Sequence, residues 1–214
     1  NYTFACASAT QSQADWLGAL GRAPRFIGGV PELIVPDNTR SMVSEPDRYA
    51  PQLQRTTAEF AQHYGVAILP ARPYKPQDKS KVEVGVQIVQ RWILARLRHR
   101  RFFSLAELDV AIAELLEDLN ARSFQRLPGN RRSAFETLDQ PALRALPATP
   151  FQFAQWMKAK PNIDYHVEFD GHYYSVPHAL VGQVLELRVT LSSIECFASG
   201  RRVAVHARSH RRGA

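Results

Sequence analysis

Two short stretches decide how this chain is read: LIVPDN at residues 33–38 and KPQDKSKVE at residues 75–83. The first is an apolar run ending in Pro36-Asp37, a pattern that predicts a buried strand with a carboxylate at its end. The second is a basic loop that runs into a helix carrying Glu83, and 45 residues separate this carboxylate from Asp37. Because α/β proteins place ligands at strand ends, we interpret the two carboxylates as candidate ligands of one metal site.

The residues after the basic loop recur with a helical period. Five apolar side chains are spaced by three or four residues and share one helical face: Val82, Val86, Val89, Ile93 and Leu97. Glu83 lies at the edge of this stripe. A carboxylate at an apolar edge, near Lys75, Lys79 and Lys81, suits a hard divalent cation that faces a phosphate. One Asp after a strand and one Glu on a helix also occur in most α/β proteins, so ordinary surface groups remain the alternative.

The positive charge of the chain is concentrated in one part. The 214 residues carry a net charge of +7, and residues 70–102 contain nine Lys or Arg against two acidic residues. Such a stretch predicts a nucleic-acid partner, and a solvated basic helix face is the alternative. The candidate DNA contacts are Arg72, Lys75, Lys79, Lys81, Arg91 and Arg98 in or near this stretch, with Arg201 and Arg202 close to the C-terminus.

Other features narrow the class of protein. No apolar run approaches the roughly 18 residues of a membrane span and no signal peptide begins the sequence, which favours a cytoplasmic protein without membrane contact. Cys6 and Cys196 are far apart and fit no metal spacing, so we expect two buried thiols in a reducing compartment. No phosphate-binding glycine loop is present, so we expect no ATPase activity.

The order of predicted elements indicates an α/β domain over about residues 1–120. We expect a strand at 2–7, a helix capped by Thr10 and ending near Leu20, a turn-rich passage at 24–29 and a strand at 33–35. A helix over 52–64 that ends at Gly65, a strand at 66–69 and a helix over 80–99 follow. Ser104 and Glu107 form a predicted capping box for a last, leucine-rich helix.

The remaining residues divide into a linker and a second domain. Residues 121–150 contain scattered prolines and predict a linker with one short helix near 133–138. Arg126, Arg131 and Arg132 in this linker could contact phosphates, or could simply be solvated. From residue 151 to 214, five short alternating runs with tight turns predict a small all-β barrel with a basic tail.

The two opening stretches resemble a known family. LIVPDN at 33–38 is similar to the second-aspartate strand of integrase-type DDE transposases, and PYKPQDKSKVE at 73–83 is similar to their basic loop and glutamate helix. GGVP at 28–31 and LNAR at 119–122 also fit. Together with the predicted barrel, these stretches resemble the IstA group of insertion-sequence transposases over nearly the whole chain.

The resemblance implies a fold and a chemistry. The expected fold is an RNase H-like integrase core, incomplete at its N-terminus because the family's first catalytic Asp precedes the strand at 2–7, followed by the barrel. The family implies two Mg²⁺ or Mn²⁺ ions held by three carboxylates, here Asp37, Glu83 and one upstream Asp. It also implies transposon-end and target DNA as substrates, self-association into a multimer and an AAA+ ATPase helper protein, in a bacterial cytoplasm.

Three functions remain open at this point. The first is a transposase fragment that performs metal-dependent DNA strand transfer as part of a longer protein. The second is a DNA-binding or assembly module of a transposase that is inactive alone because the first Asp is absent. The third is a nuclease of the same fold, which the predicted barrel and linker favour less.

Overall fold

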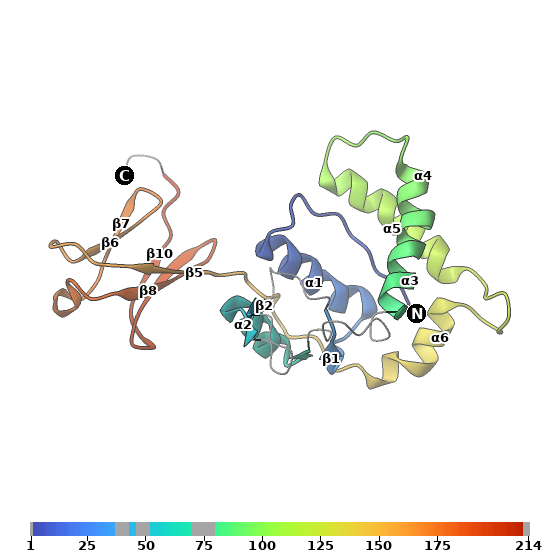
Figure 1. The fold of residues 1–214 in the computed structure, drawn as a ribbon, viewed down its shortest axis with the longest axis horizontal. Helices are drawn as coiled ribbons and strands as arrows, with labels where there is room; N and C mark the ends of the chain where they lie inside the picture. The colour runs from blue at the N-terminus through green and yellow to red at the C-terminus, as the bar shows by residue number, and fades with distance from the viewer. Residues whose placement is uncertain (1, 37–42, 46–51, 70–79, 212–214) are drawn as a thin grey trace. The chain divides into compact units, whose positions relative to one another are not determined.

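The computed structural model describes residues 2–36, 43–45, 52–69 and 80–211 (Figure 1). It divides into two compact units, residues 1–151 and 152–214, which we describe separately. Several residues of the predicted site lie outside the described residues: Asp37, Arg72, Lys75 and Lys79. Of Lys81, only the position of its backbone in a helix is described.

The first unit opens with helix α1, Gln13–Ile27, which packs on helix α2, Arg55–Tyr64. Leu17 and Phe60 are fully buried in this unit. The predicted cap at Thr10 is wrong. Ser12 is the N-cap, and its hydroxyl accepts a hydrogen bond from the backbone N–H of Asp15 at 3.2 Å, while Thr10 bonds the Asp15 carboxylate instead.

Helix α1 continues seven residues beyond its predicted end at Leu20. Pro24 lies inside the helix, although the sequence predicts a turn there. A proline removes one donor from the helix ladder, and this local cost is tolerated where packing favours the helix. Pro24 is buried, and its carbonyl accepts the N–H of Gly28, whose left-handed φ of 79° ends the helix.

Two of the predicted strands are present as one short parallel pair. A second pair forms where no strand was predicted, and Gln52 and Leu53 are part of it rather than of the predicted helix over 52–64, which begins at Arg55. Strand β1, Leu33–Ile34, pairs in parallel with β4, Ala67–Ile68, while β2, Val43–Glu45, pairs antiparallel with β3, Gln52–Leu53. The prediction that the run at 33–35 is buried is wrong, since Leu33 and Val35 are 46% and 45% exposed. Gly65 ends α2 in the left-handed region, as predicted.

Residues 2–8 form no strand in the described structure, which contradicts the prediction for 2–7. Their backbone is held by side chains instead. Thr3 donates its N–H to the Asn120 carbonyl oxygen at 3.0 Å and accepts from the Asn120 amide at 2.8 Å. The N–H of Ala7 donates to Asp109 at 2.7 Å. Because both partners lie on a distant helix, no local pattern could have predicted this arrangement.

The predicted helix over 80–99 is present with one irregular turn. It consists of α3, Ser80–Val89, a π-helical turn η2, Gln90–Leu94, and α4, Ala95–Leu97. Its apolar stripe is only partly core, because Ile93 and Leu97 are buried while Val86 is 50% exposed.

Helix α5, Leu105–Ala121, packs against this irregular helix. Ser104 caps α5 by accepting the N–H of Glu107 at 3.1 Å, as predicted. The Glu107 carboxylate bonds the N–H of Phe103 rather than that of the cap residue, so the reciprocal half of the capping box is displaced by one residue. The buried side chains of the shared core are Ile93, Leu97, Ala111, Ile112 and Leu116.

Residues 121–150 are part of the first unit rather than a linker between domains. They contain helix α6, Arg131–Leu138, and the 3₁₀ turn η3, Gln140–Ala142. Phe135 on α6 is buried and stacks on Tyr2 with ring centroids 4.6 Å apart. A backbone bridge between Val30 and Arg144 ties the end of the segment to the region before β1.

The second unit is built of strands, as expected. A four-stranded antiparallel sheet has the order β10-β9-β8-β5, and a separate hairpin joins β6 to β7. The bounds are β5 Gln155–Ala159, β6 His166–Phe169, β7 His172–Ser175, β8 Leu185–Val189, β9 Ser193–Ala198 and β10 Arg201–Ala207, with a 3₁₀ turn η4 at His178–Leu180. The sequence missed β5, because the polar residues of its QWMKA run are three positions apart rather than alternating and the run has no β-branched residue.

The hairpin and the sheet share one hydrophobic core. Val167 and Tyr174 of the hairpin are buried with Leu185, Leu187 and Ile194 of the sheet. Buried residues alternate with more exposed ones along β7 and β8. This agrees with the alternating sequence pattern from which these strands were predicted. Within the described residues the pairing gives a four-stranded sheet with a packed hairpin, so closure into a barrel stays a prediction.

Candidate nucleic-acid interface

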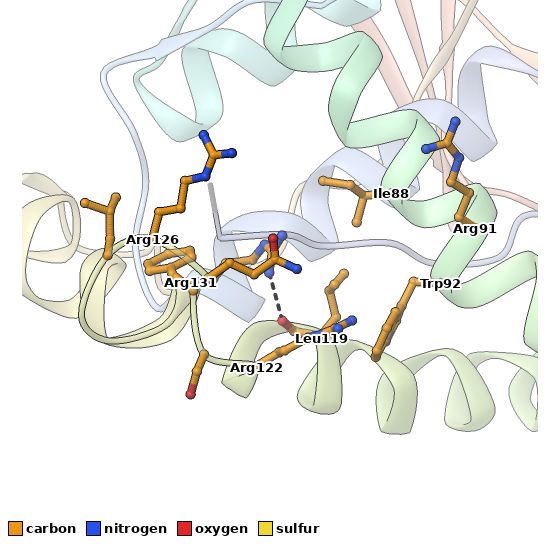
Figure 2. A pocket seen from close by; sticks show the side chains of 11 residues that line it. Ile88, Arg91, Trp92, Leu119, Arg122, Arg126 and Arg131 are labelled. Atoms are coloured by element: carbon orange, nitrogen blue, oxygen red, sulfur yellow. Dashed lines mark hydrogen bonds between the residues drawn. The ribbon is translucent and has the colours of Figure 1, made fainter.

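A pocket of about 470 Å³ lies in the first unit, beside helix α3, turn η2 and the end of α5. Figure 2 shows its lining, with Arg126 and Arg91 on opposite sides of the view and Trp92, Arg122 and Leu119 along α5 and η2. The lining residues are Ile88, Arg91, Trp92, Leu119, Arg122, Ser123, Phe124, Gln125, Arg126, Leu127 and Arg131. Four arginines and no carboxylate line it, so the pocket is suited to an anion.

Local structure explains why four arginines line one pocket. Arg91 lies on η2, Arg122 follows the last residue of α5 and Arg131 is the first residue of α6. The loop between the two helices is closed by a Ser123–Asn130 bridge. Its turn includes Gly129 at a left-handed φ of 82°, which a residue with a side chain rarely adopts. This closed loop brings Arg126 to the same pocket.

The α6 end of the pocket is fixed by capping. Asn130 accepts the N–H of Ser133 at 2.8 Å, and the Ser133 hydroxyl accepts the N–H of Asn130 at 3.0 Å, which is a reciprocal capping box. Arg131 then donates from Nη1 to the carbonyl of Leu119 at 3.3 Å, the bond drawn in Figure 2. This bond joins the first turn of α6 to the last turn of α5.

Trp92 forms part of the pocket wall and interacts with two cations. The Arg96 guanidinium lies 3.7 Å from the ring centroid and that of Arg122 lies 4.6 Å from it. Both distances are within the range of cation–π attraction, which contributes about 0.5–2 kcal/mol. The indole N–H of Trp92 and the Nε–H of Arg131 are buried without a hydrogen-bond partner.

The arginines outside the pocket are paired differently. Arg96 bonds Asp118 at 3.1 Å, Arg132 bonds Glu117, and Arg22 bonds Asp109 at 2.6 Å. Among the residues that the structure describes, no carboxylate pairs with Arg91, Arg122, Arg126 or Arg131. Within the described ranges, the arginines that join helices are thus neutralised, whereas those of the pocket have no carboxylate partner.

The candidate metal site is described only in part. Glu83 is exposed on the first turn of α3, and Asp37 lies outside the described residues. Within the described ranges, no group of three or more His, Cys, Asp or Glu side chains is placed to hold a metal ion. The prediction that Asp37 and Glu83 share a metal therefore stays a prediction.

The other predicted DNA contacts differ in whether their side chains are already hydrogen-bonded or ion-paired. Arg98 is exposed and donates to the neighbouring His99 at 3.0 Å. Arg201 is exposed at the start of β10. Arg202 donates to Glu195 at 2.8 Å, and Glu195 also accepts from Arg188 at 3.1 Å, so its charge is partly neutralised within the sheet.

The two cysteines differ in burial. Cys196 is fully buried in the core of the second unit, and burial raises the pKa of its thiol to about 11. Cys6 is only half-buried, which corrects the prediction of a buried thiol, and desolvation raises the pKa of this thiol as well. Neither thiol is part of the arginine-lined pocket.

A second hollow of about 640 Å³ is apolar and lies between residues 2–5 and helix α3. Val84, Val86 and Leu94 line it and are each about half exposed, at 51%, 50% and 54%. This explains why the apolar stripe of α3 is longer than the described core: its first turns face the hollow.

Sequence reasoning missed two residues of the arginine-lined pocket. Arg122 was part of the LNAR stretch that resembles the family but was not a candidate contact, and Trp92 was not singled out as one. The available signal was the spacing of Trp92 and Arg96 by four residues, which places both on one helical face. The meeting of this face with Arg122 depends on the packing of two helices, which no short window of sequence contains.

The family described as Mu transposase, C-terminal domain, matches residues 146–214. This range includes all of the second unit. Across the described part of the chain, no helix combines the length and the apolar character needed to cross a membrane.

Curated relatives extend the similarity to the entire chain. The putative transposase for insertion sequence IS408 of Burkholderia multivorans is 61% identical over 213 residues, covering 100% of this chain and 41% of the relative. The putative transposase for IS1162 of Pseudomonas fluorescens is 53% identical and covers 100% of this chain and 38% of the relative. The IS21 transposase of Pseudomonas aeruginosa is 28% identical over 88% of this chain.

One solved structure aligns with most of the chain, the simian T-cell lymphotropic virus intasome in complex with PP2A regulatory subunit B56 gamma. The alignment covers 95% of this chain and 67% of the solved chain, at 12% sequence identity and a TM-score of 0.48. The chain spans about 40% of the length of the IS408 and IS1162 relatives. Over its whole length the chain is therefore similar to putative transposases of insertion sequences, and residues 146–214 match the C-terminal domain of Mu transposase.

Proposed function

We propose that this chain is part of a DDE transposase that joins DNA strands in a metal-dependent reaction. The observation that carries the proposal is the 61% identity to a putative insertion-sequence transposase over the whole chain. The proposed architecture is an RNase H-like core followed by a small β-barrel. The parallel pairing of β1 with β4, with helix α2 between them in the chain, supports such a core, because parallel strands connected through a helix are the unit of an α/β sheet.

The proposed metal ligands are Asp37 and Glu83, with a third carboxylate in the remainder of a protein as long as its relatives. The fit can be tested for Glu83 alone: its carboxylate is exposed on the first turn of α3, and oxygen ligands of this kind are those that Mg²⁺ and Mn²⁺ take. Two such ions would supply stabilisation of the attacking and leaving oxygens at phosphorus. The proposed role of Glu83 is to hold a metal ion in position at the start of helix α3.

The proposed substrate is DNA, both transposon ends and target. Exposed arginines on both units support this: Arg91 and Arg98 on the first and Arg201 on the second. Arg202, tied to Glu195, is the weaker candidate. Assembly into a multimer and a partnership with an AAA+ ATPase helper belong to the same proposal and rest on the family.

A non-catalytic DNA-binding or assembly module is the second candidate. The match of residues 146–214 to a C-terminal domain favours it, because this domain contains neither of the proposed carboxylates. In this case the chain would contribute affinity for DNA and contacts within the assembly, while the chemistry would come from other parts of the protein.

Two assays separate these functions. The first measures binding of the chain to duplex DNA as a function of salt, since each neutralised phosphate contributes about 0.9 to the slope of log K against log salt. The second measures joining of a pre-cut DNA end to a target by a protein with the full length of the relatives. Joining with Mg²⁺ supports the transposase, cleavage without joining supports a nuclease, and binding without either supports the module. Absence of any DNA binding would contradict the proposal.

A further inference from the structure

We propose that the pocket lined by Arg91, Arg122, Arg126 and Arg131 binds one phosphodiester group of a DNA backbone. This inference rests on the proposed DNA-binding function and assigns a contact point within it. The pocket contains none of the proposed metal ligands, so it would act in positioning DNA rather than in the chemistry.

The charge of the pocket carries the first step. Four arginines line the pocket and, among the described residues, none of them is paired with a carboxylate. Nearby arginines that serve to join helices are paired, as with Arg96 and Asp118. Four like charges in one place destabilise the free protein unless an anion binds between them. The planar fork of arginine matches phosphate oxygens in a bidentate geometry.

The hydrogen-bond donors carry the second step. Arg131 and Trp92 both line the pocket, and among the described residues the Nε–H of Arg131 and the indole N–H of Trp92 are buried without a partner. Buried donors without a partner are rare in folded proteins, and a missing ligand or ion is one of the ordinary reasons for them. Arg131 cannot turn away freely, because its Nη1 is already bonded to the carbonyl of Leu119.

The form of the pocket decides which part of DNA fits. Guanidinium groups of Arg96 and Arg122 already lie over the Trp92 ring, so this ring is not a free platform for a base. The recognising groups that remain are the arginine donors, which read phosphate. A volume of about 470 Å³ with a partly apolar wall accommodates a phosphate together with the sugar next to it.

The test compares two double variants of the 214-residue chain. Arg122→Gln with Arg126→Gln removes two exposed pocket arginines, and Arg25→Gln with Lys158→Gln removes two exposed cations that lie outside both the pocket and the basic stretch 70–102. Binding to a mixed-sequence duplex is followed by fluorescence anisotropy over a series of KCl concentrations. Equal thermal unfolding midpoints of the variants establish that both are folded.

The pocket variant is expected to bind DNA about tenfold or more weakly at 0.1 M salt, since charge-assisted hydrogen bonds are lost. Its slope of log K against log salt should fall by about 0.9, the value for one phosphate. The control variant should lose less than about threefold, the effect of general charge alone. Pocket and control variants with equal losses would overturn the assignment of the pocket and leave the proposed DNA binding intact.

Two further measurements distinguish a phosphate group of DNA from free phosphate as the ligand of the pocket. If the unaltered chain binds no duplex, the proposed function fails, and this inference fails with it. Inorganic phosphate is titrated at constant ionic strength while tryptophan fluorescence is recorded. Millimolar or tighter phosphate binding that the pocket variant loses, combined with unchanged DNA affinity, would assign the pocket to a free phosphate and contradict a DNA contact.

Discussion

Asn120 is the residue that best shows how the first unit is held together. Its side chain is fully buried on α5 and bonds both the N–H and the carbonyl of Thr3, 117 residues earlier in the chain. One amide therefore does for residues 2–8 what a neighbouring strand would do in a sheet. The alternation in this segment predicted a strand, and that prediction is wrong because the backbone bonds side chains of α5 rather than a neighbouring strand.

Replacement of Asn120 by Ala is expected to lower the free energy of unfolding by about 2–4 kcal/mol. Two hydrogen bonds are lost and the backbone groups of Thr3 are left without these partners, each at a cost of about 1–3 kcal/mol where water cannot reach. Urea denaturation followed by circular dichroism measures the loss. Gln62→Ala, at an exposed amide on α2, is the control and should change stability by less than about 0.5 kcal/mol. Equal effects of the two substitutions would contradict this role of Asn120.

The cysteines allow a test of burial at single residues. The folded pKa of Cys196 is raised from 9.0 to about 11, so the neutral thiol is favoured by folding. Its contribution to stability is complete below about pH 9 and is lost as the pH rises towards 11. At pH 8, iodoacetamide should leave Cys196 unmodified and alkylate the half-buried Cys6 slowly, while both react in urea. Peptide mass spectrometry reads out each site, and rapid labelling of Cys196 in the folded chain would be inconsistent with its burial.

At the scale of helices and strands, the sequence predicted where most elements lie but not all of their limits. Period and caps located α2, α5 and the long helix that begins at Ser80, because each carries its own local signal. The end of α1 was missed, since Pro24 is a local signal against a helix and only its burial outweighs that signal. Competition between Thr10 and Ser12 for the cap likewise depends on the conformation of the preceding residues.

Two glycines near α1 should respond in opposite directions to the same substitution. A Cβ on Gly29 would lie 2.9 Å from the carbonyl oxygen of Arg144 and 2.7 Å from the Leu143 side chain, at the point where the Val30–Arg144 bridge forms. A Cβ on Gly18, inside α1, would meet nothing within 4 Å. Gly29→Ala should therefore destabilise the chain by about 1–3 kcal/mol, whereas Gly18→Ala should stabilise it by about 0.5–1 kcal/mol.

Thermal and urea unfolding of the two glycine variants provide the measurement. Because both substitutions add the same methyl group, the difference between them isolates the space available at each position. A stabilising effect at Gly29 would show that residues 143–144 do not approach it as closely as described.

The candidate interface shows what a sequence pattern can predict and what it cannot: local charge can be predicted, but the packing of one element on another cannot. Exposed arginines on the helix at 80–97 could be predicted, because the charge run is local. The pocket could not be predicted, because Arg122 and Arg126 reach it only through the packing of η2 on α5 and the closed loop before α6. Asp37, the proposed metal ligand, lies outside the described residues, so its proposed pairing with Glu83 rests on the sequence and its resemblance to the family.

The whole molecule consists of two units with separate cores, which the sequence anticipated from the change to short strands after residue 150. The second unit buries its own set of side chains, including Val167, Leu187 and Ile194. A fragment of residues 152–214 is therefore expected to fold alone, with a cooperative urea transition and dispersed amide signals in NMR spectra. A fragment that is unfolded by both criteria would show that this core depends on the first unit.

The role of Glu83 is the central claim for the function of the whole protein. In a protein with the full length of the relatives, Glu83→Gln is expected to reduce Mg²⁺-dependent joining of a pre-cut transposon end by at least about a thousandfold, because a catalytic group that acts as part of a unit cannot be replaced by the others. DNA binding should be unchanged within about threefold. Glu114→Gln, at an exposed carboxylate on α5, is the matched control and should retain joining. Replacing Mg²⁺ by Ca²⁺ should allow DNA binding without joining, since Ca²⁺ is larger and holds a looser geometry.

The measurement that decides is the rate of strand joining by the Glu83→Gln protein beside that of the Glu114→Gln protein, at equal DNA occupancy. The account predicts joining by the control and none above background by the Glu83 variant. Full joining by the Glu83 variant would contradict the account, and Asp78, five residues earlier in the basic loop, would then be the carboxylate to examine.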